Sequence, residues 1–142
     1  MIKDIRHTGI VVTDLETSLR FYRDFLGFQV AKQMEEAGDY IDTVLSLRNV
    51  EVTTVKLTSP AGQMIELLKY QSHPAEQRMR EICEIGISHI AFTVGDLDVE
   101  YERLKGKGIQ FNSLPQLSPD GYAKVAFCRA PEGTFIELVE VL

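Results

Sequence analysis

The chain contains two copies of one residue pattern, and this internal repeat limits the possible folds more than any other feature of the sequence. Residues 60–67 return as residues 131–138, each with a Pro-x-Gly turn followed by a Glu inside an apolar run. Residues 7–15 return as residues 89–97, with His, Asp and Leu at identical spacing. Self-similarity of this kind is the signature of a fold built from repeated units.

Each copy is predicted to fold in the order strand, helix and three strands. Apolar, β-branched runs between turn residues indicate the strands, and apolar residues at helical spacing indicate the helices. Asp14 and Asp96 precede the two helices as N-caps. The first copy is predicted to form strands over residues 5–13, 28–35, 50–58 and 64–70 and a helix over 15–26. The second is predicted to form strands over residues 87–94, 109–112, 122–129 and 134–141 and a helix over 97–107.

The first copy holds extra residues between its helix and its final hairpin, because the step from residue 7 to 89 is longer than the step from 60 to 131. Ile41, Val44 and Leu45 lie at helical spacing there and predict a short inserted helix over residues 38–47, beside the site. Residues 71–86 are predicted to be a connector, polar at first and then helical in pattern. We therefore expect a single α+β domain over residues 1–142, with modules at about 5–70 and 87–142.

Composition excludes several classes of function. The chain has 142 residues, 44% of them hydrophobic and 25% charged, which is ordinary for a soluble protein. No apolar run approaches the roughly 18 residues of a membrane span. A net charge of −6 without a lysine or arginine cluster argues against a nucleic-acid partner. The N-terminus is charged almost at once and lacks the apolar core of a secretory signal, so we expect a cytoplasmic protein.

The two cysteines, Cys83 and Cys128, form no CxxC pair. In a cytoplasmic chain of this size a disulfide is not needed for stability. We expect two reduced, buried thiols.

Each copy carries one His and one Glu that can ligate a metal: His7 and Glu66 in the first, His89 and Glu137 in the second. Successive strand residues point to opposite faces, and the neighbours on the opposite face are large and apolar, as a core requires. On the face of the ligands, small residues follow the two histidines at position i+2 and leave room for a ligand. We predict that all four side chains face one cavity and that both carboxylates are enclosed.

Two imidazoles and two carboxylates suit a divalent ion such as Zn, Ni, Co, Fe or Mn. Four protein ligands leave coordination positions for water or for a substrate oxygen. The expected cofactor is therefore a divalent metal ion.

The sequence resembles the vicinal oxygen chelate superfamily, which includes glyoxalase I, methylmalonyl-CoA epimerase, the extradiol dioxygenases and the fosfomycin and bleomycin resistance proteins. The resemblance covers essentially the whole chain. It implies paired βαβββ modules that form a half-open, curved barrel of mixed sheet around a metal, and a homodimer. The motifs that carry it are His7-x6-Asp14-Leu15, Phe21-Tyr22-x3-Leu26-Gly27-Phe28, Pro60-x-Gly62-x3-Glu66-Leu67, His89-Ile90-Ala91-Phe92-x-Val94 and Pro131-x-Gly133-x3-Glu137-Leu138.

The ligand set favours the branch of glyoxalase I and methylmalonyl-CoA epimerase. By resemblance, bacterial glyoxalase I has His, Glu, His and Glu at the four positions above. The epimerase usually has Gln in place of Glu66, whereas extradiol dioxygenases and fosfomycin enzymes use two His and one Glu. Glyoxalase I also holds glutathione with an Arg and an Asn at the positions of Val11 and Tyr70, so glutathione is not the expected substrate here.

The expected activity is proton transfer on a small substrate with vicinal oxygens, as in a lactoylglutathione lyase-like or epimerase-like enzyme. A metal that binds two neighbouring oxygens acidifies the adjacent C–H as a Lewis acid, and a carboxylate moves the proton. Glu66 or Glu137 is the predicted catalytic base. Glu51 is a weaker candidate.

Two alternatives stay open at this stage. One is an Fe- or Mn-dependent dioxygenase, against which Glu66 argues because a second carboxylate fills a position that O2 or substrate needs. The other is a metal-free protein that binds a small molecule, as some resistance proteins do, against which the four ligands argue.

Overall fold

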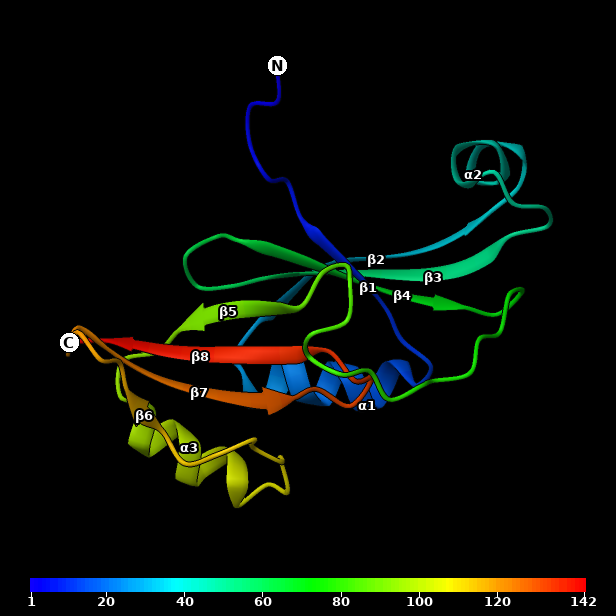
Figure 1. The fold of residues 1–142 in the computed structure, drawn as a ribbon. Coiled ribbons are helices and arrows are strands. Elements are labelled where there is room, and N and C mark those ends of the chain that lie inside the picture. The colour runs from blue at the N-terminus through cyan, green and yellow to red at the C-terminus, as the bar shows by residue number, and fades with distance from the viewer. The chain divides into compact units, whose positions relative to one another are not determined.

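The computed structural model describes residues 1–142 and divides them into two compact units, Met1–Gln77 and Arg78–Leu142. Each unit contains one four-stranded mixed sheet (Figure 1). The division falls inside the predicted connector, and the predicted order of elements is confirmed in both units. The assignment of both modules to a single domain stays a prediction. No helix in the chain is long and apolar enough to cross a bilayer.

The first unit forms a sheet with strand order β1-β4-β3-β2, in which β1 is parallel to β4 and the other pairs are antiparallel. The inserted helix predicted within residues 38–47 is present as α2. The elements of this unit are β1 (Thr8–Val11), α1 (Leu15–Leu19), the π-helical turn η1 (Arg20–Phe25), β2 (Gln29–Ala37), α2 (Asp39–Leu45), β3 (Glu51–Thr58) and β4 (Met64–Tyr70).

The second unit repeats the topology with strand order β5-β8-β7-β6, in which β5 is parallel to β8. Helix α3 contacts β7 and β8. The elements of this unit are β5 (His89–Thr93), α3 (Leu97–Lys105), β6 (Gln116–Leu117), β7 (Ala123–Arg129) and β8 (Phe135–Val141).

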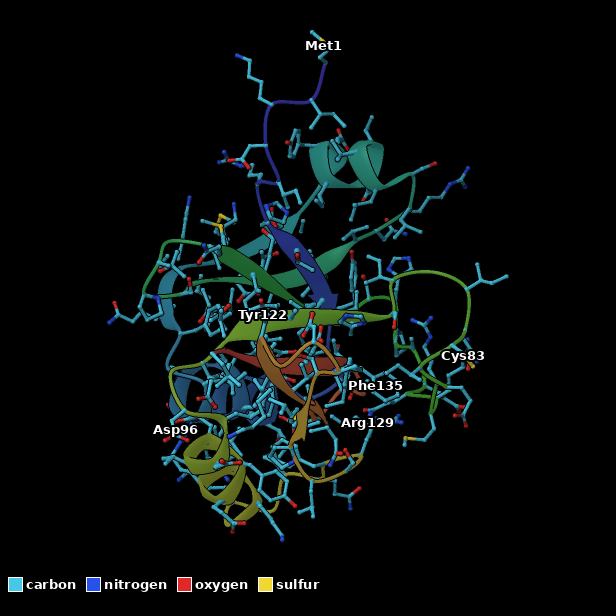
Figure 2. The ribbon with its side chains drawn as sticks, turned by 60° about the vertical axis from the view of Figure 1, so that its left-hand side comes forward. Met1, Cys83, Asp96, Tyr122, Arg129 and Phe135 are labelled. Carbon is cyan, nitrogen blue, oxygen red and sulfur yellow. The ribbon has the colours of Figure 1, made fainter.

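Aspartate N-caps begin the first helix of both units, as predicted. Asp14 accepts a hydrogen bond from the backbone N–H of Thr17 at 3.0 Å, and Asp96, labelled in Figure 2, accepts one from Val99 at 3.0 Å. These bonds satisfy backbone donors that have no partner inside the helix. The first helix continues through η1 to Gly27, whose φ of 81° is the left-handed conformation expected at a helix C-terminus.

The Pro-x-Gly turns set the register of the last hairpin in both units. Gly62 and Gly133 have φ of 88° and 97°, a conformation that favours glycine. After these turns, Lys56 of β3 lies opposite Glu66 of β4, and Phe127 of β7 lies opposite Glu137 of β8. Paired residues share a face of the sheet, so the register decides what each carboxylate meets.

The face of each sheet opposite the two glutamates is apolar and closely packed. In the first unit Ile65 and Leu67 are buried there, and in the second Ile136 and Leu138 are buried. This confirms the predicted core face. Helix α2 packs on the other face, where Ile41 joins a buried cluster with Val50 and Val52 that also contacts Leu68 and Tyr70. Alternation places Leu68 and Tyr70 on the same side of β4 as Glu66, so α2 covers one end of that face.

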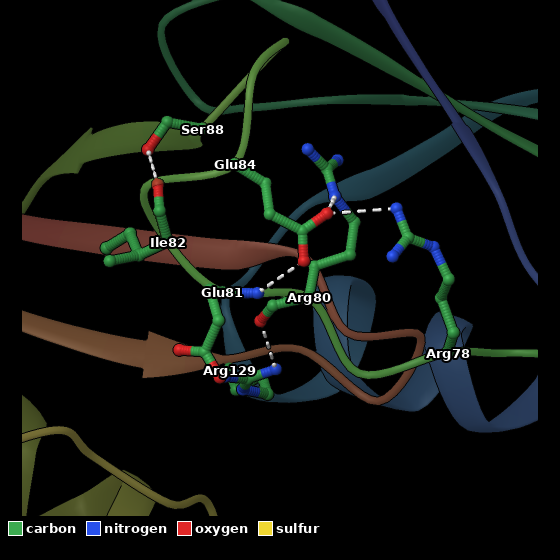
Figure 3. Close-up of polar contacts among 7 residues, drawn as sticks. All are labelled: Arg78, Arg80, Glu81, Ile82, Glu84, Ser88 and Arg129. Atoms are coloured by element: carbon green, nitrogen blue, oxygen red, sulfur yellow. Dashed lines mark hydrogen bonds and ion pairs between the residues drawn. The ribbon is translucent and has the colours of Figure 1, made fainter.

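Three predicted segments differ in the structure. The strand predicted over 109–112 is reduced to a bridge between Phe111 and Cys128, and pairing with β7 resumes only at β6. Pro115, which has no backbone N–H to donate to the ladder, lies in the gap. The connector contains no helix. It is held instead by ion pairs of Glu84 with Arg78 and Arg80 (Figure 3).

The first predicted strand is also shorter than 5–13. Its parallel partner β4 begins at Met64, and the ladder starts with Thr8 opposite Ile65. His7 therefore lies immediately before β1 rather than within it.

Candidate metal centre

The first unit brings His7 and Glu66 together. Nε2 of His7 lies 3.3 Å from Oε2 of Glu66, and the carboxylate side chain is only 13% exposed. Gly9 pairs with Glu66 across the parallel strands. A Cβ at Gly9 would lie 3.4 Å from the end of the Leu68 side chain, which is ordinary van der Waals contact.

The second unit repeats this arrangement with His89 and Glu137. Nε2 of His89 lies 3.1 Å from Oε2 of Glu137, whose side chain is 21% exposed. Ala91 pairs with Glu137, as Gly9 does with Glu66. Both carboxylates are thus mostly enclosed, as predicted, and each has one imidazole beside it. That all four side chains face one cavity stays a prediction.

The remaining ring nitrogen differs between the two histidines. Nδ1 of His89 lies 3.1 Å from Oγ of Ser88, which donates to the carbonyl of Ile82 at 3.1 Å (Figure 3). Because the serine proton goes to Ile82, the serine oxygen can accept Nδ1–H and leave a lone pair on Nε2. Nδ1 of His7 is buried and has no hydrogen-bond partner.

The two glutamates also meet different neighbours across the sheet. Nζ of Lys56 lies 3.7 Å from Oε1 of Glu66. In the second unit, the ring of Phe127 packs edge-on against His89, with ring centroids 5.1 Å apart. Reasoning from the sequence missed Lys56 and Ser88. The hairpin register, counted back from the Pro60 turn, places Lys56 opposite Glu66 and could have revealed it.

The spacing of each pair fits donors on a single cation. Two donors bound at about 2.0–2.2 Å and at roughly 90–110° to one another lie about 2.9–3.5 Å apart, and the two pairs measure 3.3 and 3.1 Å. The Ser88 bond to Nδ1 of His89 also fits, because a ligating imidazole commonly donates its other ring N–H to a partner. Nδ1 of His7 has no such partner. Neither unit alone assembles three or more His, Cys, Asp or Glu side chains into a metal site.

Three further polar side chains, among them the weaker candidate base Glu51, have structural roles or lie in the open. Arg129 stacks on the ring of Phe135 with its guanidinium carbon 4.1 Å from the centroid, and it also donates to the carbonyl of Arg80 (Figures 2 and 3). The side chain of Tyr122 is 72% exposed. Glu51 is exposed at the start of β3.

One of the two thiols is buried and the other is exposed. Cys128 is buried, and burial raises the pKa of its thiol to about 12, so it is not a nucleophile at neutral pH. Cys83 is exposed, and the prediction that it is buried was wrong. The connector forms no helix that could turn Cys83 inward (Figure 2).

Comparison with known proteins gives a consistent result. Residues 4–138 match the sequence model of the Glyoxalase/Bleomycin resistance protein/Dioxygenase superfamily. The uncharacterized protein YwkD of Bacillus subtilis is 31% identical, over 99% of this chain and 98% of its own length. An ethylmalonyl-CoA/methylmalonyl-CoA epimerase of Cereibacter sphaeroides is 26% identical, over 99% of this chain and 100% of its own length. The crystal structure of a glyoxalase family protein from Bacillus cereus superimposes with a TM-score of 0.89 at 23% identity, covering 100% of this chain and 96% of that one.

Proposed function

Because this chain belongs to the Glyoxalase/Bleomycin resistance protein/Dioxygenase superfamily, we propose that it is a metal-dependent enzyme of proton transfer. Its substrate is a small molecule with two vicinal oxygens, and its reaction is of the glyoxalase-like lyase or epimerase-like isomerase kind. His7, Glu66, His89 and Glu137 together ligate one divalent metal ion. The observation that carries the proposal is the His–Glu pair that recurs at the same register in both units, at 3.3 and 3.1 Å.

The four side chains suit Zn, Ni, Co, Fe or Mn. When bound, such an ion supplies Lewis-acid stabilisation of the negative charge that develops on the substrate oxygens. Glu66 or Glu137 accepts the proton from the substrate carbon and returns it, and their enclosure keeps bulk water away from the transfer. The full-length similarity to an epimerase supports this class of reaction.

Glutathione is not the proposed substrate. At the two positions where glyoxalase I is expected to hold glutathione, this chain has Val11 and Tyr70, which supply neither a guanidinium nor an amide. Both line a small open hollow with Lys69 and His73. The ring of Tyr70 contributes to the apolar cluster under α2. We expect the purified protein, loaded with metal, to be inactive on methylglyoxal plus glutathione.

Metal analysis of purified protein tests the site directly. We expect His7→Ala and Glu137→Ala each to lose the metal that the wild-type protein carries. His73→Ala and Glu51→Ala are the matched controls, since they remove the third histidine and an exposed strand glutamate, and they are expected to keep it. Unchanged metal content in both ligand variants would contradict the four-ligand site. Oxygen uptake with catechols under Fe(II) would instead indicate a dioxygenase.

The homodimer and the cytoplasmic location are further parts of the proposal. Light scattering of the purified protein tests the first, with a mass of two chains as the expected result. Fractionation of the native host tests the second.

A further inference from the structure

One charged side chain beside the candidate ligands cannot itself ligate a metal while it is an ammonium ion. Lys56 lies in β3 directly opposite Glu66, and its side chain is 24% exposed. Its Nζ is 3.7 Å from Oε1 of Glu66, whereas His7 contacts the other carboxylate oxygen, Oε2. The ammonium group therefore stands on the side of the carboxylate away from His7.

A lysine in this position works against the binding of a cation. Charges of like sign repel each other across several ångströms, more strongly in a partly enclosed site than in water. Holding a metal ion therefore does not explain Lys56. The second unit does without such a charge, because Phe127 occupies the corresponding position opposite Glu137.

The positive charge suits an anion that enters next to the metal. We propose that Lys56 binds an anionic oxygen of the substrate, which makes the substrate a small carboxylate with a neighbouring oxygen, such as a 2-oxo or 2-hydroxy acid. This inference rests on the proposed function and narrows its substrate class. A hydrogen bond from an ammonium group to a carboxylate is among the stronger polar contacts in proteins.

Oxalate tests the inference, because it is an anion with vicinal oxygens and requires no catalysis. Zinc affinity is first measured by calorimetry, and oxalate is then titrated into the zinc-loaded protein. For Lys56→Gln we expect oxalate binding to weaken by about tenfold or more, the value of one charge-assisted hydrogen bond. Zinc should bind as tightly as in the wild type or several-fold more tightly, because a repelling charge is removed. Lys56→Arg should retain oxalate binding.

Lys124→Gln is the matched control. Lys124 is also 24% exposed and pairs with two carboxylates, those of Asp98 at 2.6 Å and Glu140 at 3.7 Å, but it lies on the face of its sheet opposite to Glu137. It should change neither affinity.

The possible results distinguish a failure of the inference from a failure of the proposed function. Weakening of both zinc and oxalate in Lys56→Gln would indicate a structural role and overturn the inference, as would unchanged oxalate affinity. A wild-type protein that binds none of the five candidate metals would overturn the proposed function and this inference with it.

Discussion

In the first repeat Glu66 faces a lysine across the sheet, whereas in the second Glu137 faces an aromatic ring. The histidines differ as well, because Ser88 supports His89 and nothing supports the second nitrogen of His7. The backbone around the two pairs is nevertheless the same in topology and register. The comparison teaches that strand pairing positions the His and the Glu, while the cross-strand neighbours are free to differ and can give each half its own task.

The largest expected effect concerns whether the two pairs serve one ion or two. A double variant His7→Ala/Glu66→Ala and a double variant His89→Ala/Glu137→Ala should each weaken zinc binding by more than about a hundredfold, because loss of a supporting residue alone costs about ten- to a hundredfold. Calorimetry and metal analysis give affinity and stoichiometry, with one ion per chain expected for the wild type. Two independent sites would show two ions, and each double variant would keep one.

The buried leucine that follows each glutamate should stabilise the fold by a similar free energy in the two units. Leu67 and Leu138, the residues after the two glutamates, are 0% and 1% exposed. Leu67→Ala and Leu138→Ala should each lower the free energy of unfolding by about 2–5 kcal/mol, through lost burial and the cavity left behind. Urea denaturation measures this, and Leu117→Ala, at a side chain 61% exposed, is the control with a change within about 0.5 kcal/mol. A large loss of unfolding free energy in only one of the two leucine variants would contradict this expectation.

The serine beside His89 should matter more than a similar serine elsewhere. Ser88→Ala removes the partner of Nδ1 and should weaken zinc binding by about tenfold. Ser72 makes the same kind of contact with Nδ1 of His73, at 2.7 Å, outside the candidate site. Ser72→Ala should leave zinc affinity unchanged. Equal effects of the two substitutions would show that Ser88 acts on stability and not on the metal ligand.

The smallest expected effect is at Gly9, the counterpart of Ala91. The added Cβ of Gly9→Ala would meet only the end of the Leu68 side chain, at 3.4 Å, which can shift. We expect stability to change by less than about 1 kcal/mol and zinc affinity to change by less than about twofold. A tenfold weaker zinc affinity would mean that the first unit requires glycine at position 9, where the second unit accommodates Ala91.

Much of the fold follows from local sequence signals. The strand predicted over 64–70 coincides with β4, because a Pro-x-Gly turn and alternating side chains mark both its start and its faces. The inserted helix also has a local cause in the spacing of Ile41, Val44 and Leu45. The repeat and strand alternation predicted that the His and Glu of each copy share a face of the sheet, and each His lies beside its Glu at 3.3 and 3.1 Å, although His7 precedes β1.

The features that the sequence did not reveal have separate physical causes. The apolar residues of the connector suggest a helix, but ion pairs around Glu84 hold it in an irregular path. The edge strand near Pro115 is interrupted, although its residues have strand propensity. Lys56 is placed by the register of the β3–β4 hairpin, and Ser88 by its contacts with the neighbouring His89 and the carbonyl of Ile82, so no hydrophobic pattern marks either residue.

The tight turns before β4 and β8 have a consequence for how the protein tolerates change. A strand side chain changes face whenever the register slips by one residue. One residue gained or lost between Gly62 and Glu66, or between Gly133 and Glu137, would therefore swing the carboxylate into the hydrophobic interior and bring an Ile or Leu out in its place. The number of residues between each turn glycine and its glutamate therefore matters more for the site than the identity of those residues.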